Sequence, residues 1–219
     1  NAIIKSNVNN VVLAKITSIT NADPNANGTA VPTGTQRQIA QFKFSTAAAS
    51  NLKNGTNKFT LSGVIFNVNA TNVQLGTGDN SAAATSTFKL YNRADQSVKA
   101  TCTGSGGTVL APAPSPKAQS GSLIVICKNL MATSINTEID PGSDVTFVLE
   151  AQIANAKISN SSTSTLQVSV QGFTDIAATL FGAADSHIAW ADKDNASAPN
   201  VFKWIEYPDT SVNGTSYNG

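Results

Sequence analysis

Charged residues are scarce in this chain. Lys, Arg, Asp and Glu make up 12% of the 219 residues, and the formal net charge is +1. The charges are scattered singly, without a basic stripe, which argues against binding to nucleic acid or to an anionic membrane. No apolar run approaches the roughly 20 residues that a membrane-spanning helix needs. The surface must therefore be polar but largely uncharged, as the abundance of Asn, Ser and Thr also indicates.

Catalytic side chains are equally scarce. His187 is the single histidine, within Asp185–His187, and neighbouring residues on one strand point to alternating faces rather than converging as a nucleophile and its base must. A structural or surface histidine is the simpler interpretation. The three glutamates, Glu138, Glu150 and Glu206, lie in no recognisable motif, and we expect Glu150 to be solvated on the polar face of a strand. The sequence predicts no enzyme and no cofactor.

Metal ligands are also few. Asp192 and Asp194 stand at alternate positions, followed by Asn195 and Ser197, as oxygen ligands do in a calcium loop. The glycine and the distal glutamate of a helix-loop-helix calcium site are missing, so a plain polar turn explains the segment equally well. Asp192 and Asp194 remain weak calcium candidates, and no other metal site is expected.

What the chain does contain is a series of β-strand patterns, clearest between Gly121 and Ile158. Ser122–Cys127 is a short, β-branched apolar run, which is typical of an inner strand. Asp140–Ser143 (Asp-Pro-Gly-Ser) predicts a turn, because proline presets φ and glycine permits positive φ. Apolar residues then alternate with mostly polar ones in a period of two, at Val145, Phe147, Leu149, Ala151 and Ile153.

Further strand patterns recur at the spacing of a β-sandwich. Residues 58–70 alternate, with a shift of phase at Gly63 that predicts a β-bulge. Other alternating or β-branched runs cover residues 36–45, 87–91, 97–103 and 164–171, and no segment shows a helical period. The predicted fold is all-β, a single β-sandwich of immunoglobulin-like or jelly-roll-like type with about 9–11 strands. We assign residues 21–190 to this core and 191–219 to a loop-rich segment packed on it.

Two cysteines, Cys102 and Cys127, each lie in a strand-like segment. Cysteines on neighbouring strands of a secreted sandwich usually pair. A disulfide here would close a loop of about 25 residues and stabilise the fold by roughly 3 kcal/mol. The alternative is two buried free thiols in a reducing compartment.

Residues 1–20 form an apolar, β-branched terminal segment without helix caps, followed by a turn-rich loop over residues 21–34. Such a strand can close its own domain or leave it and complete the sheet of a neighbouring subunit. The apolar residues of this candidate donor strand are Ile3, Ile4, Val8, Val11, Val12, Leu13 and Ile16.

Localisation and modification follow as expectations. Because the chain starts at Asn1 without a charged and apolar leader, we expect a mature secreted form, although a trimmed protein would look the same. Asn-x-Ser/Thr sequons provide candidate glycosylation sites, but roughly as many arise by chance in so Asn-, Ser- and Thr-rich a chain. The sequons start at Asn27, Asn54, Asn69, Asn160, Asn195 and Asn213.

Two features together resemble a known group of proteins. One is "FKLY" followed after a turn by "DVTFVLEAQI", and the other is the terminal "SHIAWADKDNASAPNVFKWIEYP". They resemble β-sandwich modules at the C-terminal ends of large secreted surface proteins from candidate-phyla bacteria, over roughly the last two thirds of the chain. The matching positions are His187, Ile188, Trp190, Asp192 and Trp204. The resemblance implies a structural role at the cell surface, in an S-layer or an appendage, and assigns no catalytic residue.

Three aromatic residues near the end of the chain, Trp190, Trp204 and Tyr207, offer a candidate sugar-stacking platform, although tryptophans there more often pack against the sandwich edge. Taken together, the sequence predicts an extracellular structural subunit of a homopolymer, a pilus-like filament assembled by strand addition between copies. The alternatives are an S-layer subunit and a secreted carbohydrate-binding or adhesin module. The expected partners are other copies of the chain, and in those alternatives glycans or other surface proteins.

Overall fold

The computed structural model describes residues 16–24, 30–47, 59–75, 88–105, 119–156, 163–170, 188–192 and 212–218. These ranges contain twelve β-strands and one short 3-10 turn, η1 (Leu130–Ala132), and no α-helix. The strands are β1 (Ile16–Asn21), β2 (Gly34–Thr46), β3 (Phe59–Leu75), β4 (Lys89–Asn92), β5 (Asp95–Thr101), β6 (Thr103–Ser105), β7 (Gln119–Cys127), β8 (Glu138–Ile139), β9 (Asp144–Ala156), β10 (Thr165–Val170), β11 (Ile188–Asp192) and β12 (Val212–Asn218).

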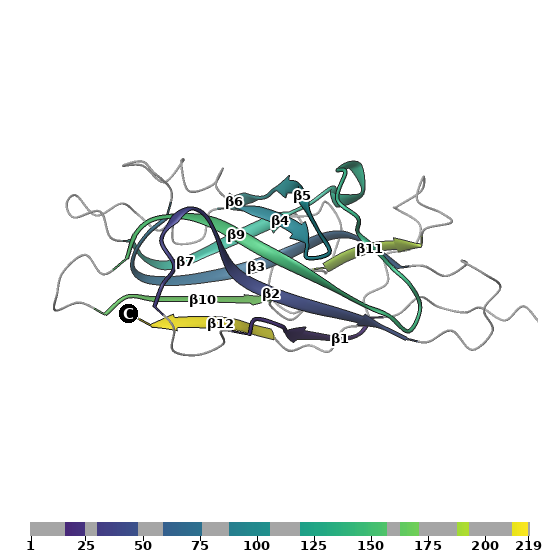
Figure 1. Cartoon of the computed structure of the whole chain (residues 1–219), viewed down its shortest axis with the longest axis horizontal. Coiled ribbons are helices and arrows are strands. Elements are labelled where there is room, and N and C mark those ends of the chain that lie inside the picture. Colours follow the sequence, from purple (N-terminus) through teal and green to yellow (C-terminus); the bar gives the residue numbers. More distant parts are fainter. Residues whose placement is uncertain are drawn as a thin grey trace, which may run out of the picture.

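All strand pairs are antiparallel and fall into two groups (Figure 1). The first group has the order β1-β2-β9-β4-β5. The second has the order β12-β10-β3-β7-β6, with β11 and β8 pairing with the beginning of β3. At its far end β3 leaves the second group and pairs with the end of β9, so the described strands form one continuous, curled network.

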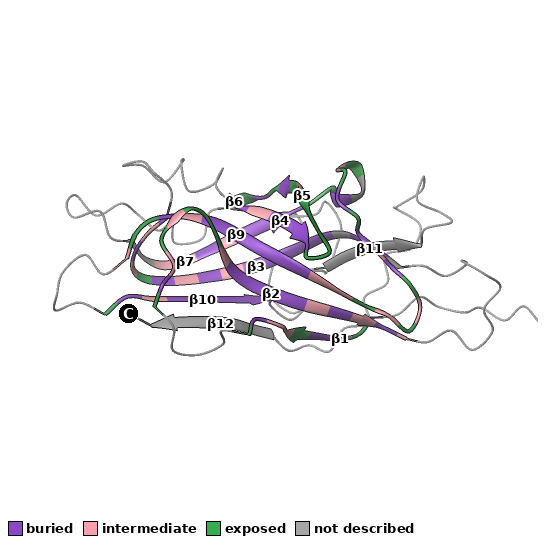
Figure 2. Cartoon of the chain, viewed as in Figure 1, coloured by how far each residue is buried: buried purple, intermediate pink, exposed green. Residues whose placement is uncertain are grey.

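The core lies between the two groups. Phe42 of β2 stacks on Phe66 of β3 with ring centroids 5.6 Å apart, and Phe44 meets the edge of Phe147 at 5.5 Å. Buried positions recur along β2, β3, β9 and β10 (Figure 2). The predicted apolar face of β9 is confirmed from Phe147 onward, because its inward residues through Ile153 are at most 1% exposed, and Val145 packs partly buried against the same core.

Local predictions from turn chemistry also hold. The Ser143 amide donates to the Asp140 carbonyl at 3.0 Å, and Gly142 has a φ of 70°, as the predicted turn requires. The bulge expected at Gly63 is present as well. Ala189 of β11 lies opposite Gly63 while the next residue, Trp190, lies opposite Leu61, so β3 carries one extra residue there.

The all-β prediction is confirmed, and the described strands number twelve rather than about 9–11. A single sandwich of immunoglobulin-like or jelly-roll type stays a prediction, because β3 and β9 connect both groups into one network. The predicted loop-rich C-terminal segment includes the described stretch Val212–Asn218. That stretch is β12, paired with β10, because backbone pairing can recruit a polar sequence that shows no apolar alternation.

Candidate functional site

The two cysteines are paired as the sequence indicated. Their sulfur atoms lie 1.97 Å apart and their Cα atoms 4.4 Å apart, at disulfide distance. Cys102 stands between β5, which pairs with β4 in the first group, and β6, which pairs with β7 in the second. The disulfide therefore lies where one edge segment passes from the first group of strands to the second.

Of the apolar residues in the predicted donor strand, the structure describes only the last. Ile3, Ile4, Val8, Val11, Val12 and Leu13 lie outside the described residues, and Ile16 begins β1. Ile16 is 1% exposed and lies opposite Thr46 of the same chain. Ile16–Asn21 thus pairs with its own sheet, which corrects the predicted boundary: any donor segment ends before Ile16.

Most of the other predicted site residues lie outside the described residues or in strands whose side chains are not described. Asn27, Asn54, Asn160, Asn195, Asp194, Trp204, Tyr207 and His187 lie outside the described residues. Trp190, Asp192 and Asn213 belong to β11 or β12, of which only the backbone pairing is described. Asn69 lies within β3, half-buried, and accepts a hydrogen bond from Ser122. It is therefore a strand residue rather than the exposed loop residue that a glycan normally needs.

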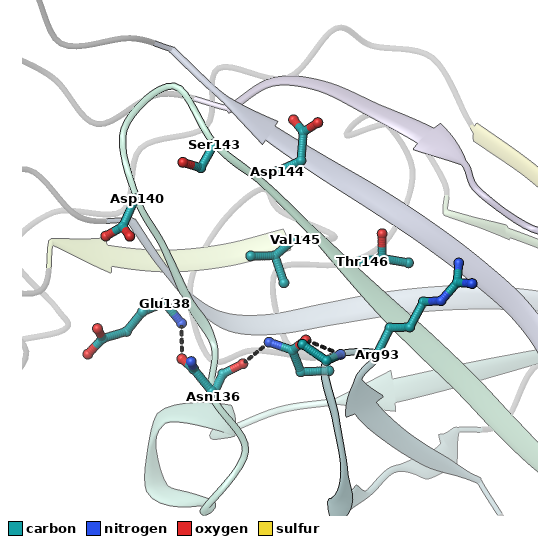
Figure 3. Close-up of a pocket in the computed structure, with 10 residues that line it drawn as sticks. Arg93, Asn136, Glu138, Asp140, Ser143, Asp144, Val145 and Thr146 are labelled. Carbon is teal, nitrogen blue, oxygen red and sulfur yellow. Dashed lines mark hydrogen bonds between the residues drawn. The ribbon is translucent and has the colours of Figure 1, made fainter.

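One polar pocket of about 600 Å³ opens beside the start of β9 (Figure 3). It is lined by Asn92 and the β4–β5 turn, by Asn136 and Glu138, by Asp140, and by residues 143–146. The Asn92 amide donates to the Asn136 carbonyl at 2.9 Å, and the Asn136 side chain accepts from the Glu138 amide at 3.0 Å. These bonds fix the wall of the pocket and use part of the hydrogen-bonding capacity of its two asparagine side chains.

The carboxylates around this pocket do not converge. Figure 3 shows Glu138, Asp140 and Asp144 pointing in different directions, with the Arg93 side chain directed away from all three. The Arg93 guanidinium donates instead to Gln41 at 2.9 Å. Among the described residues no group of three His, Cys, Asp or Glu could hold a metal ion. The pocket therefore offers a polar surface to a ligand but no assembled acid–base pair or cation site.

A second polar arrangement lies on the outer face of the first group of strands and centres on Glu150 of β9. Its side chain is only 9% exposed, contrary to the solvated position expected from its place in the strand. The Lys99 ammonium of β5 lies 2.7 Å from Glu150 Oε2 and 4.7 Å from the centre of the Tyr91 ring. Three strands, β5, β4 and β9, thus contribute one residue each to a compact cluster, which we call the Glu150 cluster (Lys99, Tyr91, Glu150).

The electrostatics of the Glu150 cluster follow from its burial. Burial is the main cause that raises the pKa of Tyr91 to about 12, and the Glu150 charge and its hydrogen bond with the Tyr91 hydroxyl raise it further, while Arg93 acts in the opposite direction. Tyr91 therefore stays protonated and donates to Glu150 throughout the neutral range. A Lys–acid contact is also one requirement of an internal isopeptide bond, but no described hydrogen bond or ion pair brings an asparagine into this cluster.

β5 forms an edge of the sheet. Among the strands that the structure describes it pairs with β4 alone. Its residues Asp95, Gln96, Ser97, Lys99 and Thr101 are exposed, whereas Ala100 is buried against the core. The Ser97 amide donates to the Asp95 carboxylate at 3.0 Å, and the Ser97 hydroxyl hydrogen bond is the main cause that lowers the pKa of Asp95. The beginning of β5 is thus capped by its own side chains, whereas in its later part the Thr101 hydroxyl accepts a hydrogen bond from Lys89 of β4 at 3.3 Å.

Comparisons with known proteins give no family assignment. No protein-family model matches the chain, and no curated protein matches it. Among solved structures, a similar chain is AvmM, which catalyses macrocyclization in alchivemycin A biosynthesis. The two share 11% identity over 82% of this chain and 86% of that one, with a TM-score of 0.26. So low a score supports no inference about fold or chemistry.

No helix among the described residues is long and apolar enough to span a membrane. The disulfide is compatible with an oxidising, extracytoplasmic compartment, where such bonds persist.

Proposed function

We propose that this protein is a structural, non-catalytic subunit of an extracellular polymer, in which residues 1–15 of one copy add as a β-strand to the sheet of the next. The observation that carries the proposal is the position of β1. The apolar segment 1–15 runs directly into β1, which among the described strands pairs with β2 alone and whose first residue, Ile16, is already in register with Thr46. A chain that leaves a sheet at its edge with an apolar, β-branched sequence is suited to pair with another sheet.

The polymer would be held by main-chain hydrogen bonds and by apolar side chains seated at alternate positions. A contact between a donor segment and a different acceptor surface does not close on itself, so it generates a filament rather than a dimer. The Cys102–Cys127 disulfide supports the extracellular part of the proposal.

The test is negative-stain electron microscopy and sedimentation of the full chain beside a variant that lacks residues 1–15. We expect thin fibres from the full chain and dispersed particles from the deletion, with the same near-ultraviolet circular dichroism for both. A two-dimensional lattice that survives the deletion would replace strand addition by the lateral packing of an S-layer. Fibres that form without residues 1–15 would contradict the donor role of the segment.

A second candidate, a carbohydrate-binding or adhesin module, is favoured by the polar pocket near the start of β9. Amides, hydroxyls and carboxylates around a cavity of about 600 Å³ are groups that recognise hydroxylated ligands. Binding of the full chain to a glycan array, lost on Asp140→Asn, would support this candidate. Binding to no glycan would remove it.

A further inference from the structure

We propose that β5 is the acceptor edge onto which residues 1–15 of a second copy add, and that Glu150 keeps this edge accessible by holding Lys99 away from it. The inference rests on the proposed function and extends it, because it names the acceptor strand and a residue that controls it.

In the later half of β5, no hydrogen bond among the described residues uses the backbone groups that face away from β4. The Cys102 amide donates to the Phe88 carbonyl at 2.9 Å, and Ala100 lies opposite Leu90 of β4. In an antiparallel ladder alternate residues face opposite sides, so Thr101 directs its N–H and C=O groups away from β4, and the Lys99 C=O, opposite in direction to the Ala100 N–H, points the same way; before Lys99 the register with β4 shifts. An incoming strand would meet these two residues, beyond the part of β5 that Asp95 caps.

A lysine on an edge strand normally discourages pairing, because its charge would have to lie beside the incoming chain. Lys99 does not occupy that position. Its ammonium extends over the Tyr91 ring toward Glu150 of β9 and is 30% exposed. The ion pair draws the Lys99 charge onto the outer face of the sheet, while the Lys89 ammonium of β4 lies 3.3 Å from the Thr101 hydroxyl on that face. Glu150 therefore acts on the edge through Lys99 and is a positioning residue.

The position of β1 indicates that residues 1–15 are the segment that pairs with the β5 edge of another copy. β1 and β5 lie at opposite edges of the first group, with β2, β9 and β4 between them. Four strand spacings separate the edges by about 19 Å. A donor that leaves one edge and an acceptor at the opposite edge make a head-to-tail contact, which repeats from copy to copy. The apolar residues of segment 1–15 would extend the buried row that Ala100 ends.

The test compares two acid-to-amide substitutions in the full chain by sedimentation of the polymer. Glu150→Gln frees Lys99 to lie along the edge, and we expect the protein concentration needed for assembly to rise about tenfold, because each added strand must again immobilise or displace that side chain. Asp144→Asn is the matched control: Asp144 pairs with Lys43 on the same sheet face, 3.4 Å away, but away from β5. It should change the assembly concentration less than about twofold.

A rescue variant separates this effect from misfolding. Adding Lys99→Met to Glu150→Gln removes the freed charge, and assembly should return to nearly the level of the unchanged chain. Thr101→Pro tests the acceptor edge directly, because it removes an N–H that points away from β4 without breaking the ladder with β4. This substitution should abolish fibres and leave the circular dichroism spectrum unchanged. In the unchanged polymer, hydrogen exchange at Thr101 should be slower than in dispersed protein.

The outcomes distinguish this inference from the proposed function. If the full chain forms fibres that depend on residues 1–15, but Glu150→Gln and Thr101→Pro assemble normally, the acceptor edge lies elsewhere and only this inference is overturned. If Thr101 is protected in dispersed monomers, the segment pairs with β5 of its own copy, which overturns it too. Fibres that need no residues 1–15 overturn the proposed function itself.

Discussion

The two faces of β9 are both buried at the middle of the strand, but by different physics. The inner face buries Phe147, Leu149 and Ala151 by apolar packing against the opposite strands. The outer face buries Val148 and Glu150, at 1% and 7% exposure, among polar side chains from the neighbouring strands β2, β4 and β5. The comparison shows that a strand with one apolar face need not expose the other.

The largest loss of stability is expected when an aromatic ring is removed from the inner face of β9. Phe147→Ala removes a buried ring that meets Phe44 edge to face, and we expect the free energy of unfolding to fall by about 3–5 kcal/mol. Phe147→Leu is the control and should cost less, because most of the volume is retained. Urea unfolding followed by tryptophan fluorescence measures both. Equal costs for the two variants would mean that the inner face is not closely packed.

The second largest loss of stability is expected on the outer face of β9, when the Lys99–Glu150 ion pair is broken. Glu150→Gln leaves Lys99 without its carboxylate and should lower the free energy of unfolding by about 2 kcal/mol, less than for a fully buried pair because Lys99 keeps contact with solvent. A double-mutant cycle with Lys99→Met should give a coupling energy of about 1–2 kcal/mol. The same cycle on Lys43 and Asp144, whose side chains are 42% and 51% exposed, should give less than about 1 kcal/mol. Equal coupling in the two pairs would remove the distinction between them.

Alkaline pH should weaken the outer face through Tyr91. Since the Tyr91 pKa is raised to about 12 in the folded chain against about 10 when unfolded, its contribution is complete below pH 10 and is lost as the pH rises to about 12. We expect the free energy of unfolding to fall by about 2 kcal/mol over that range. Tyr91→Phe should remove both this slope and the latest tyrosine step in absorbance at 295 nm. If Tyr91→Phe keeps the same dependence of the unfolding free energy on pH, another group causes that dependence.

The smallest change in stability is expected for a substitution at the exposed end of β9. A hydrogen bond from the Ser45 side chain is the main cause that lowers the pKa of Asp144, with Lys43 adding to it. The contribution is present above the unfolded pKa and is lost as the pH falls through the lower folded value. Ser45→Ala should move the Asp144 pKa back toward its ordinary range in an NMR titration, with almost no change in unfolding. A large change in stability would show that this end is not solvated.

The sequence predicted features that depend on neighbours along the chain. The period-two pattern of residues 145–153, the turn at Asp140–Ser143 and the bulge at Gly63 each have a local cause, and each was predicted correctly. The pairing of Cys102 with Cys127 could be inferred because both lie in strand-like segments.

The features that were missed depend on partners distant in sequence. Glu150 has the alternation of a solvated residue, and its burial depends on Tyr91 and on Lys99, which is 51 residues away. Ile16 carries the same apolar signal whether it pairs with its own sheet or with another, so the boundary of the donor segment could not be read from composition. The edge position of β5 depends on strand order, which no local pattern encodes.

The disulfide has a mechanical consequence. If a polymer of this protein is stretched, each subunit is pulled along its backbone, and a covalent bridge between residues 102 and 127 lets the load bypass the chain between them. The bypassed stretch has a sequence separation of 25, which corresponds to about 85 Å of extended chain. Single-molecule pulling should therefore give a shorter unfolding step in the oxidised protein than in the reduced one, by about that length. Under tension the hairpin-like region that includes β6 and β7 would stay folded back on itself while the rest of the subunit yields.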